Sequence, residues 1–197
     1  MGTNLFKQDF NVSRNDREQL HGHKGLCVWF VGLSGSGKST ISNAFQSFLF
    51  QKGIHTYTLD GDNIRMGINK DLSFSAEDRS ENLRRIAEIA KLFTDAGTVV
   101  LSSFITPLDS DREHIRSLLG DDYVEVFVNC PLEVCEQRDV KGLYAKARRG
   151  EIPNFTGISA PFEEPAHPDL KLPSHELNLE DSVQLLWNEL QPKLNLL

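Results

Sequence analysis

The chain has 197 residues, of which 39% are hydrophobic and 25% are charged. This is the composition of a globular domain, and it excludes disordered, collagen-like and coiled-coil proteins. The net charge is −7, from 21 basic and 28 acidic residues, so a duplex nucleic acid is disfavoured as a partner.

Cysteine usage and the chain start bear on the compartment. The three cysteines, Cys27, Cys130 and Cys135, are too few to build a disulfide framework, and we expect them to be buried and structural. The first residues lack the apolar segment of a secretory signal, and the apolar run 26–33 is far shorter than the ~20 residues of a membrane span. We therefore expect a cytoplasmic protein without membrane contact. The spacing His21-x-His23 is interpreted as a surface pair rather than a metal site.

Short apolar runs alternate with helical patterns along most of the chain. Ser75 is a candidate N-cap with Asp78 three residues later, and Gly97 is the expected end of that helix. The alternation predicts βαβ units, hence an α/β fold with a parallel sheet flanked by helices in three layers. The expected strands are 26–33, 54–60, 98–104 and 123–129, and the expected helices are 39–53, 75–97, 111–120 and 179–194.

Residues 138–173 carry most of the prolines and are interpreted as a long surface excursion of the kind that often forms a lid. Such a segment could close over a triphosphate, or its basic residues could be an ordinary solvated helix face. The basic residues of its first part are Arg138, Lys141, Lys146, Arg148 and Arg149. We expect an N-terminal extension over 1–25, a main domain over 26–173 with a basic lid at about 138–165, and a C-terminal helix within 174–197.

Residues 32–40, GLSGSGKST, contain the complete phosphate-loop pattern G-x-x-x-x-G-K-[ST] between an apolar strand and a helix. Glycines let backbone N–H groups surround phosphate oxygens, Lys38 can reach the outer phosphates, and the Ser39 hydroxyl can bind Mg²⁺. A merely structural glycine turn is the weaker alternative. The expected contacts to ATP are Gly32, Ser34, Gly35, Ser36, Gly37, Lys38, Ser39, Thr40 and, from the lid, Arg138.

The remaining motifs favour a small kinase among P-loop proteins. A guanine-specifying N-K-x-D is missing, since residues 69–71 read NKD without the spacer. Asp60 and Asp62 follow the strand 54–60, on the ligand side of an open α/β sheet, where a carboxylate can help to hold Mg²⁺ or accept a proton from an attacking hydroxyl. We expect Asp62, Asp60 and Lys38 to be catalytic, with Ser39 and Asp62 as metal ligands.

Four residues between 65 and 82 suit an anionic acceptor. Arg79 and Asn82 share a helix face, and an arginine fork matches phosphate or sulfate oxygens, although solvated surface arginines are an equally good interpretation. By itself, the position of Phe74 before a helix favours a hydrophobic staple over stacking on a base. Arg65 completes the group.

These segments resemble the adenylyl-sulfate kinase (APS kinase) family, a group of P-loop kinases. The resemblance lies in GLSGSGKST (32–40), DGDNIR (60–65), NKDLSFS (69–75), PLEVCEQRD (131–139) and KGLYAKARRGEIPNFTGI (141–158), and it covers about residues 10–172. It implies transfer of the γ-phosphoryl of MgATP to the 3′-hydroxyl of adenosine 5′-phosphosulfate in sulfate activation. The family is often dimeric, so a homodimer is expected.

The resemblance also implies residue roles. Arg65, Arg79 and Asn82 would hold the phosphosulfate, Phe74 and Phe155 would enclose its adenine, and Lys141 would lie in the lid on the acceptor side. Ile105 and Thr106 complete the implied acceptor contacts.

The chain departs from the family in Thr106-Pro107-Leu108, where Ser-Pro-Tyr is usual, and in Met66, where histidine is common. Threonine keeps a hydroxyl that could accept phosphate, but direct in-line transfer needs no such intermediate and is preferred. Two other hypotheses stay open: another small P-loop kinase, acting on a sugar acid or nucleoside, and a degenerate nucleotide-binding module. The second is disfavoured because Lys38, Ser39 and Asp62 are all present.

Overall fold

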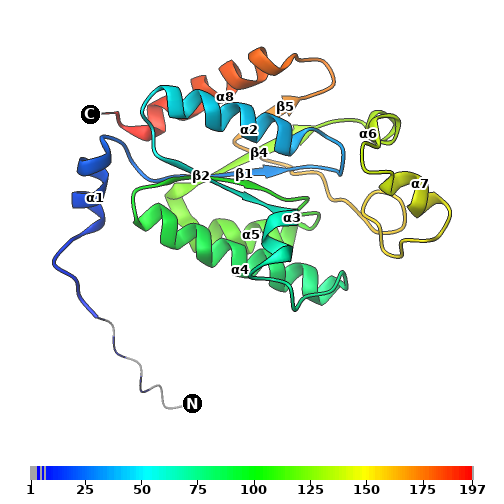
Figure 1. Ribbon diagram of the computed structural model, residues 1–197, viewed down its shortest axis with the longest axis horizontal. Helices are drawn as coiled ribbons and strands as arrows, with labels where there is room; N and C mark the ends of the chain where they lie inside the picture. Colours follow the sequence, from blue (N-terminus) through cyan, green and yellow to red (C-terminus); the bar gives the residue numbers. More distant parts are fainter. Residues whose placement is uncertain (1–3, 5, 7, 197) are drawn as a thin grey trace.

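The computed structural model describes residues 4, 6 and 8–196 (Figure 1). In this part of the chain, a parallel five-stranded sheet has the order β2-β3-β1-β4-β5, and the predicted α/β class is confirmed. The central position of β1 explains its apolar sequence, because a strand with neighbours and helices on every side is buried completely. The strands are β1 (Cys27–Val31), β2 (Thr56–Asp60), β3 (Val99–Ser103), β4 (Tyr123–Asn129) and β5 (Leu170–Pro173).

Helices cover both faces of the sheet and make the three predicted layers (Figure 1). Alternate residues of β1 point to opposite faces, so Val28 and Phe30 pack under one pair of helices while Cys27 and Trp29 pack under the other. The first pair is α2 (Lys38–Gln51) and α8 (Leu179–Leu194), and the second is α4 (Ala76–Asp95) and α5 (Asp109–Leu119).

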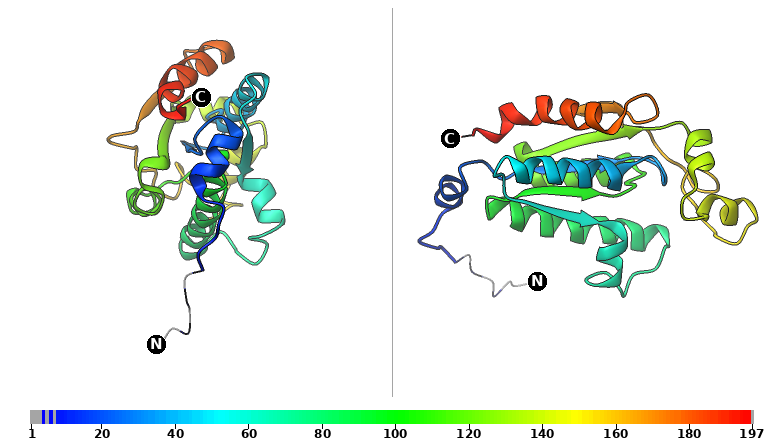
Figure 2. Two further views of the ribbon diagram at one scale, coloured as in Figure 1. Left: turned by 90° about the vertical axis from the view of Figure 1, so that its left-hand side faces the viewer. Right: turned by 45° about the horizontal axis from the view of Figure 1, so that its top comes forward.

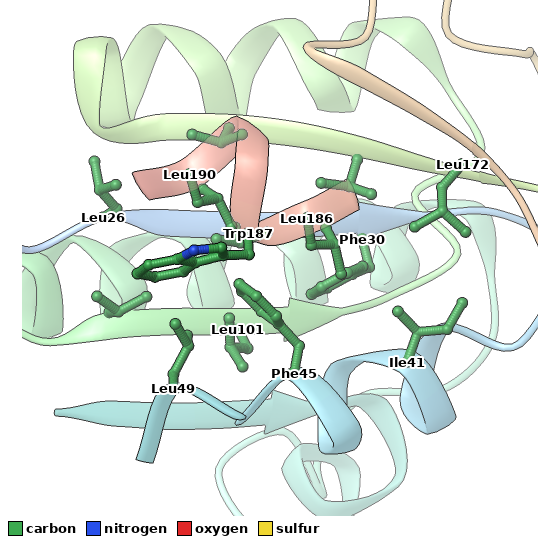
Figure 3. Packing of buried hydrophobic residues seen from close by; sticks show 14 of the residues in the cluster. Leu26, Phe30, Ile41, Phe45, Leu49, Leu101, Leu172, Leu186, Trp187 and Leu190 are labelled. Atoms are coloured by element: carbon green, nitrogen blue, oxygen red, sulfur yellow. The ribbon is translucent and has the colours of Figure 1, made fainter. Parts of the chain in front are cut away.

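Aromatic and leucine side chains form the core between the sheet and the first helix pair. Figure 3 shows Phe45 and Leu49 of α2 and Leu186 and Trp187 of α8 gathered around Phe30 of the sheet. The expected helix 179–194 is confirmed with these bounds, and its apolar face lies in this core. No described helix is both long and apolar enough to cross a membrane.

Short helices occupy the two ends of the sheet. At the carboxyl ends of the strands lie α3 (Gly61–Met66), α6 (Leu132–Arg138) and α7 (Leu143–Arg148), and α1 (Arg14–His21) lies at the opposite end (Figure 2). The phosphate loop connects β1 to α2 on the side of α3 and α6, so the candidate residues gather at the carboxyl edge, as expected for an open parallel sheet.

Several described elements were not predicted, and three of them are informative. The first is α1, whose Ser13 forms a reciprocal capping box with Asp16 in a segment taken as an extension. The second, α6, is only seven residues long. The third, β5, lies at the end of the expected surface excursion, and its Leu172 is fully buried. A four-residue strand among prolines has too little periodicity to be recognised from sequence.

The prediction that His21 and His23 form a surface pair is wrong for His23, which is 2% exposed. Its Nε2 accepts a hydrogen bond from the backbone N–H of His55 at 2.9 Å, and the rings of His21 and His55 stack at 4.9 Å. Burial, followed by the charges of His55 and His23, lowers the pKa of His21. The three cysteines are buried and free, as predicted.

Candidate active site

The phosphate loop makes a tight turn between β1 and α2. Gly32, Gly35 and Gly37 have φ angles of 151°, 75° and 103°, which residues with a side chain rarely adopt. A Cβ on Gly32 would also lie 2.6 Å from the carbonyl oxygen of Val128. Ser34 is half-buried and Ser36 is fully buried, whereas Ser39 and Thr40 are exposed at the start of α2. Glycine is therefore needed for the shape of this loop.

Lys38 is 8% exposed and reaches back into the loop. Its ammonium group donates to the carbonyl oxygens of Gly32 at 2.8 Å and Leu33 at 2.7 Å. Burial lowers the pKa of Lys38 to about 8, against the opposing effects of Cys135 and Asp60. A desolvated cation at the mouth of a glycine loop favours a bound anion, because a negative charge restores the lost solvation.

Side chains from later elements brace the loop from outside. Arg138 of α6 donates to the carbonyl oxygens of Gly35 at 3.3 Å and Ser36 at 3.4 Å, and its other Nη donates to Ser174 at 3.1 Å. The hydroxyl of Tyr144 on α7 donates to the carbonyl oxygen of Ser34 at 2.8 Å. Arg138 therefore lies beside the loop, as expected, while Tyr144 and Ser174 are supporting residues that sequence reasoning missed.

The two candidate carboxylates have different neighbours. Asp60 ends β2 and accepts a hydrogen bond from the Ser39 hydroxyl at 2.8 Å. Asp60 also caps α3 by accepting from the backbone N–H of Asp62 at 3.1 Å. The Asp62 carboxylate instead pairs with Lys141, at 2.5 Å. The carboxylate beside the P-loop hydroxyl is thus Asp60, and the one beside the lid lysine is Asp62.

A magnesium site fits this arrangement. The Ser39 hydroxyl and the Asp60 carboxylate are hard oxygen donors held together, and Mg²⁺ commonly combines one or two such protein ligands with phosphate and water. Among the described residues, no three His, Cys, Asp or Glu side chains converge as a protein-only metal site. The donor set therefore suits an ion that arrives with a nucleotide.

Arg65 and Phe74 lie together on the acceptor side. The guanidinium of Arg65 lies 4.3 Å from the centre of the Phe74 ring, and it also donates to the carbonyl oxygen of Ser73 at 2.8 Å. Phe74 is 64% exposed, so the interpretation as a hydrophobic staple is wrong. Its open ring face is available for stacking, as the family resemblance implies.

Arg79 joins α4 to the segment that follows α7. Its Nε donates to the carbonyl oxygen of Phe74 at 3.0 Å, and its Nη atoms donate to Thr156 Oγ1 at 3.0 Å and to the carbonyl oxygen of Asn154 at 2.8 Å. Burial lowers the pKa of Arg79, and burial together with the charge of Arg79 lowers the pKa of Arg65. Two partly desolvated guanidinium groups in one neighbourhood favour an anionic ligand between them.

Two further predicted acceptor residues are already packed against the protein. Phe155 is 8% exposed and meets the Tyr144 ring edge-on at 5.0 Å. Asn82 is buried, and its Oδ1 accepts a hydrogen bond from Asn69 Nδ2 at 2.9 Å. Arg79 holds the backbones of residues 74 and 154 to one side chain, so the segments that carry Phe74 and Phe155 are neighbours.

The predicted basic lid is only partly directed at the site. Arg148 pairs with Glu136 and Arg149 with Glu151, and both pairs are exposed. Of the basic residues in this stretch, Arg138 contacts the phosphate loop and Lys141 contacts Asp62. The interpretation as a solvated helix face is therefore correct for Arg148 and Arg149.

The Thr106 side chain points into the core rather than towards a substrate. It is 1% exposed, and its Oγ1 accepts a hydrogen bond from Trp29 Nε1 at 2.8 Å. Its φ of 45° is unusual for a β-branched residue, and Arg112 secures the turn by donating to the Thr106 carbonyl oxygen at 2.8 Å. The preceding residue, Ile105, supports the phosphate loop by accepting from the Gly32 N–H at 3.3 Å.

We expect Thr106→Val to lower the free energy of unfolding by about 1–3 kcal/mol, because a buried Trp29 N–H loses its acceptor. Turnover should be retained, whereas loss of a covalent phosphate acceptor would abolish it. Chemical denaturation and steady-state kinetics check both effects, with Thr106→Ser as the control that keeps the hydroxyl. A stable variant without any turnover would contradict a purely structural hydroxyl.

Comparison with known proteins agrees with this geometry. The family model described as adenylylsulphate kinase matches residues 24–173. An adenylyl-sulfate kinase of Oceanobacillus iheyensis is 52% identical over 97% of this chain and 96% of its own length. One of Bacteroides thetaiotaomicron is 54% identical over 94% of this chain and 93% of its own length.

Among solved structures, some share both sequence and fold with this chain and others share the fold alone. The APS kinase CysC of Mycobacterium tuberculosis, solved in complex with AMPPNP and APS, superposes with a TM-score of 0.82 at 48% identity, over 85% of this chain and 98% of that one. A gluconokinase of Sinorhizobium meliloti reaches a TM-score of 0.57 at 20% identity over 86% and 93%, which shows a shared fold only. The chain belongs to the adenylylsulphate kinase family.

Proposed function

We propose that the protein transfers the γ-phosphoryl group of MgATP to the 3′-hydroxyl of adenosine 5′-phosphosulfate (APS), giving 3′-phosphoadenosine 5′-phosphosulfate and ADP. One observation carries the proposal: the Asp60 carboxylate meets the Ser39 hydroxyl of a complete phosphate loop, while Asp62, two residues later, pairs with Lys141 of the expected acceptor-side lid. The relative solved with AMPPNP and APS, at 48% identity, supports the same pair of ligands.

The donor half uses the phosphate loop. Lys38 exchanges its hydrogen bonds with the Gly32 and Leu33 carbonyl oxygens for the outer phosphates, so a ligand replaces contacts that the protein already makes. Arg138 and Tyr144 keep the loop in shape by holding its carbonyl oxygens. A loop that needs no rearrangement can stabilise the developing charge of phosphoryl transfer with little reorganisation.

Mg²⁺ bound at Ser39 and Asp60 would neutralise phosphate charge and help to orient the transferred group. This assignment differs from the sequence-based expectation, which paired Ser39 with Asp62. The structure favours Asp60 because its carboxylate already meets the Ser39 hydroxyl.

Asp62 is the proposed general base. Its carboxylate accepts the proton of the 3′-hydroxyl while that oxygen attacks the γ-phosphorus in line and ADP leaves. In the ligand-free protein this carboxylate pairs with Lys141 at 2.5 Å. When the acceptor binds, Lys141 would exchange Asp62 for the substrate's anionic group.

The acceptor half binds its substrate through arginine charges and aromatic stacking. Arg65 and Arg79 meet the phosphosulfate, whose negative charges offset the mutual repulsion of the two guanidinium groups. The adenine stacks on Phe74, with Phe155 and Asn82 defining the far side of the pocket. This arrangement explains why a protein of net charge −7 accepts a dianion: the local field at the pocket is positive.

An acceptor panel tests the function. The purified protein is incubated with MgATP and either APS, AMP, gluconate or buffer alone, and ADP and the phosphorylated product are quantified. We expect product with APS alone. Product with gluconate would establish the alternative sugar-acid kinase, and nucleotide binding without turnover of any acceptor would favour a binding module.

Assembly and location are separate proposals. The family resemblance favours a homodimer, although one solved relative, from Thiobacillus denitrificans, is described as a hexameric APS kinase. We propose a homodimer in the cytoplasm, and light scattering of the purified protein decides the assembly.

A further inference from the structure

Helix α5 begins at Asp109 without a cap of its own. Its N-cap residue is Leu108, which has no side-chain oxygen, whereas Ser13, Ser75 and Asn178 cap their own helices. The missing acceptor comes from Glu163, 54 residues further along the chain, whose Oε2 accepts from the Asp109 N–H at 2.6 Å. In return, the Glu163 N–H donates to the carbonyl oxygen of Pro107 at 2.8 Å.

This contact fastens one end of a segment that we call the strap, residues 154–163. Arg79 holds the other end at Asn154 and Thr156. Between the two ends, the carbonyl oxygen of Phe155 accepts from three backbone N–H groups, those of residues 158, 159 and 160. The strap is therefore a compact turn with an attachment at each end.

The strap is fastened to the loop that supports the phosphate site. Residues 105–109 hold the Gly32 N–H through the Ile105 carbonyl, and Trp29 and Arg112 lock the Thr106 turn. Thr156 of the strap contacts Arg79, and Phe155 beside it packs on Tyr144, so the strap adjoins the proposed acceptor site. Glu163 thus connects the strap to residues 105–109, which hydrogen bonds to Gly32, Trp29 and Arg112 hold in place.

We propose that Glu163 is a positioning residue for the acceptor: its carboxylate latches the strap onto residues 105–109 and keeps Phe155 and Thr156 in their binding positions. The acceptor identity rests on the proposed function, but the latch itself does not. Glu163 contacts the start of α5 and Pro107 and none of the residues assigned to nucleotide or acceptor, so its loss would act through the strap. We expect weaker acceptor binding with little change in nucleotide binding.

A competing role is capping of α5 alone, and the chain offers a way to separate the two. Leu108 has φ −106° and ψ 139°, the extended conformation of capping residues, so Leu108→Ser supplies a local cap. In the double variant Leu108→Ser/Glu163→Ala, the helix is capped again, but the strap lacks the carboxylate contact and keeps only its backbone bond to Pro107 at this end. Glu163→Gln keeps an acceptor oxygen and should restore part of the latch, and Glu164→Ala is the matched control, at an exposed neighbour that lines an adjacent cavity.

The experiment combines hydrogen exchange of the ligand-free protein with steady-state kinetics and thermal unfolding. For Glu163→Ala we expect faster exchange of amides in 154–163 and a rise of about 3- to 10-fold in the KM for APS, the range that follows from losing one cap hydrogen bond. The KM for MgATP should stay unchanged. In the double variant, Tm should recover while exchange and the KM for APS remain raised.

Unchanged exchange in Glu163→Ala would overturn the latch, and so would full recovery of exchange and KM in the double variant. Failure of the proposed function is distinguishable: the wild type would then not turn over APS, yet the exchange experiment still reports on the latch.

Discussion

Asp62→Asn is expected to lower kcat by about 10²- to 10⁴-fold, the usual contribution of a positioned general base. Asparagine keeps the size of the side chain but cannot accept the proton of the attacking hydroxyl at neutral pH. The KM for MgATP should change little, because Asp62 pairs with Lys141 rather than with Ser39. Rapid-quench measurement of the phosphoryl-transfer step checks the effect directly.

Two variants control this experiment. Asp121→Asn removes an exposed carboxylate near the start of β4, at the opposite edge of the sheet, and should leave kcat unchanged. Asp60→Asn should instead raise the Mg²⁺ concentration needed for half-maximal rate, since Asp60 is the carboxylate beside Ser39. If Asp60→Asn shows the kcat loss and Asp62→Asn shows the magnesium effect, the two roles are reversed.

Lys38→Ala is expected to lower kcat/KM for MgATP by at least about 10²- to 10³-fold, the usual cost of removing one preorganised donor to a charge that develops in the transition state. The fold should survive, because a buried cation is removed rather than added. Lys52→Ala, at the opposite end of the same helix, is the matched control and should keep full activity. A Lys38→Ala enzyme with normal kcat/KM would refute the proposed donor site.

The same lysine predicts a pH dependence. In the ligand-free protein, burial lowers the pKa of Lys38 to about 8, so the charged form that pairs with phosphate is present below that pH. Phosphate raises this pKa in the complex, so affinity is complete below pH 8 and declines above it. The Kd of MgADP measured calorimetrically should therefore rise above pH 8 in the wild type, whereas Lys38→Ala should show no such rise.

Local patterns were sufficient for most of the fold. The strand 123–129 and the helix 179–194 have the predicted bounds, because a buried strand and an amphipathic helix each impose a strong period on the sequence. The strand β5 was missed because its position comes from pairing with β4 and not from its own composition. The burial of His23 was missed for a related reason: its partner is a backbone N–H of residue 55.

The sequence by itself determined the family, the phosphate loop and the identity of nearly every candidate residue. These residues lie in short contiguous motifs, because the chemistry of each motif needs residues that are close in sequence. Tertiary structure alone decided which of these residues contact one another. It placed Asp60 on Ser39 and Asp62 on Lys141, turned Thr106 towards Trp29, and brought Glu163 to the start of α5. These contacts join residues 21 to 79 positions apart, and no local pattern specifies them because only the packing of the sheet and its helices brings such residues together.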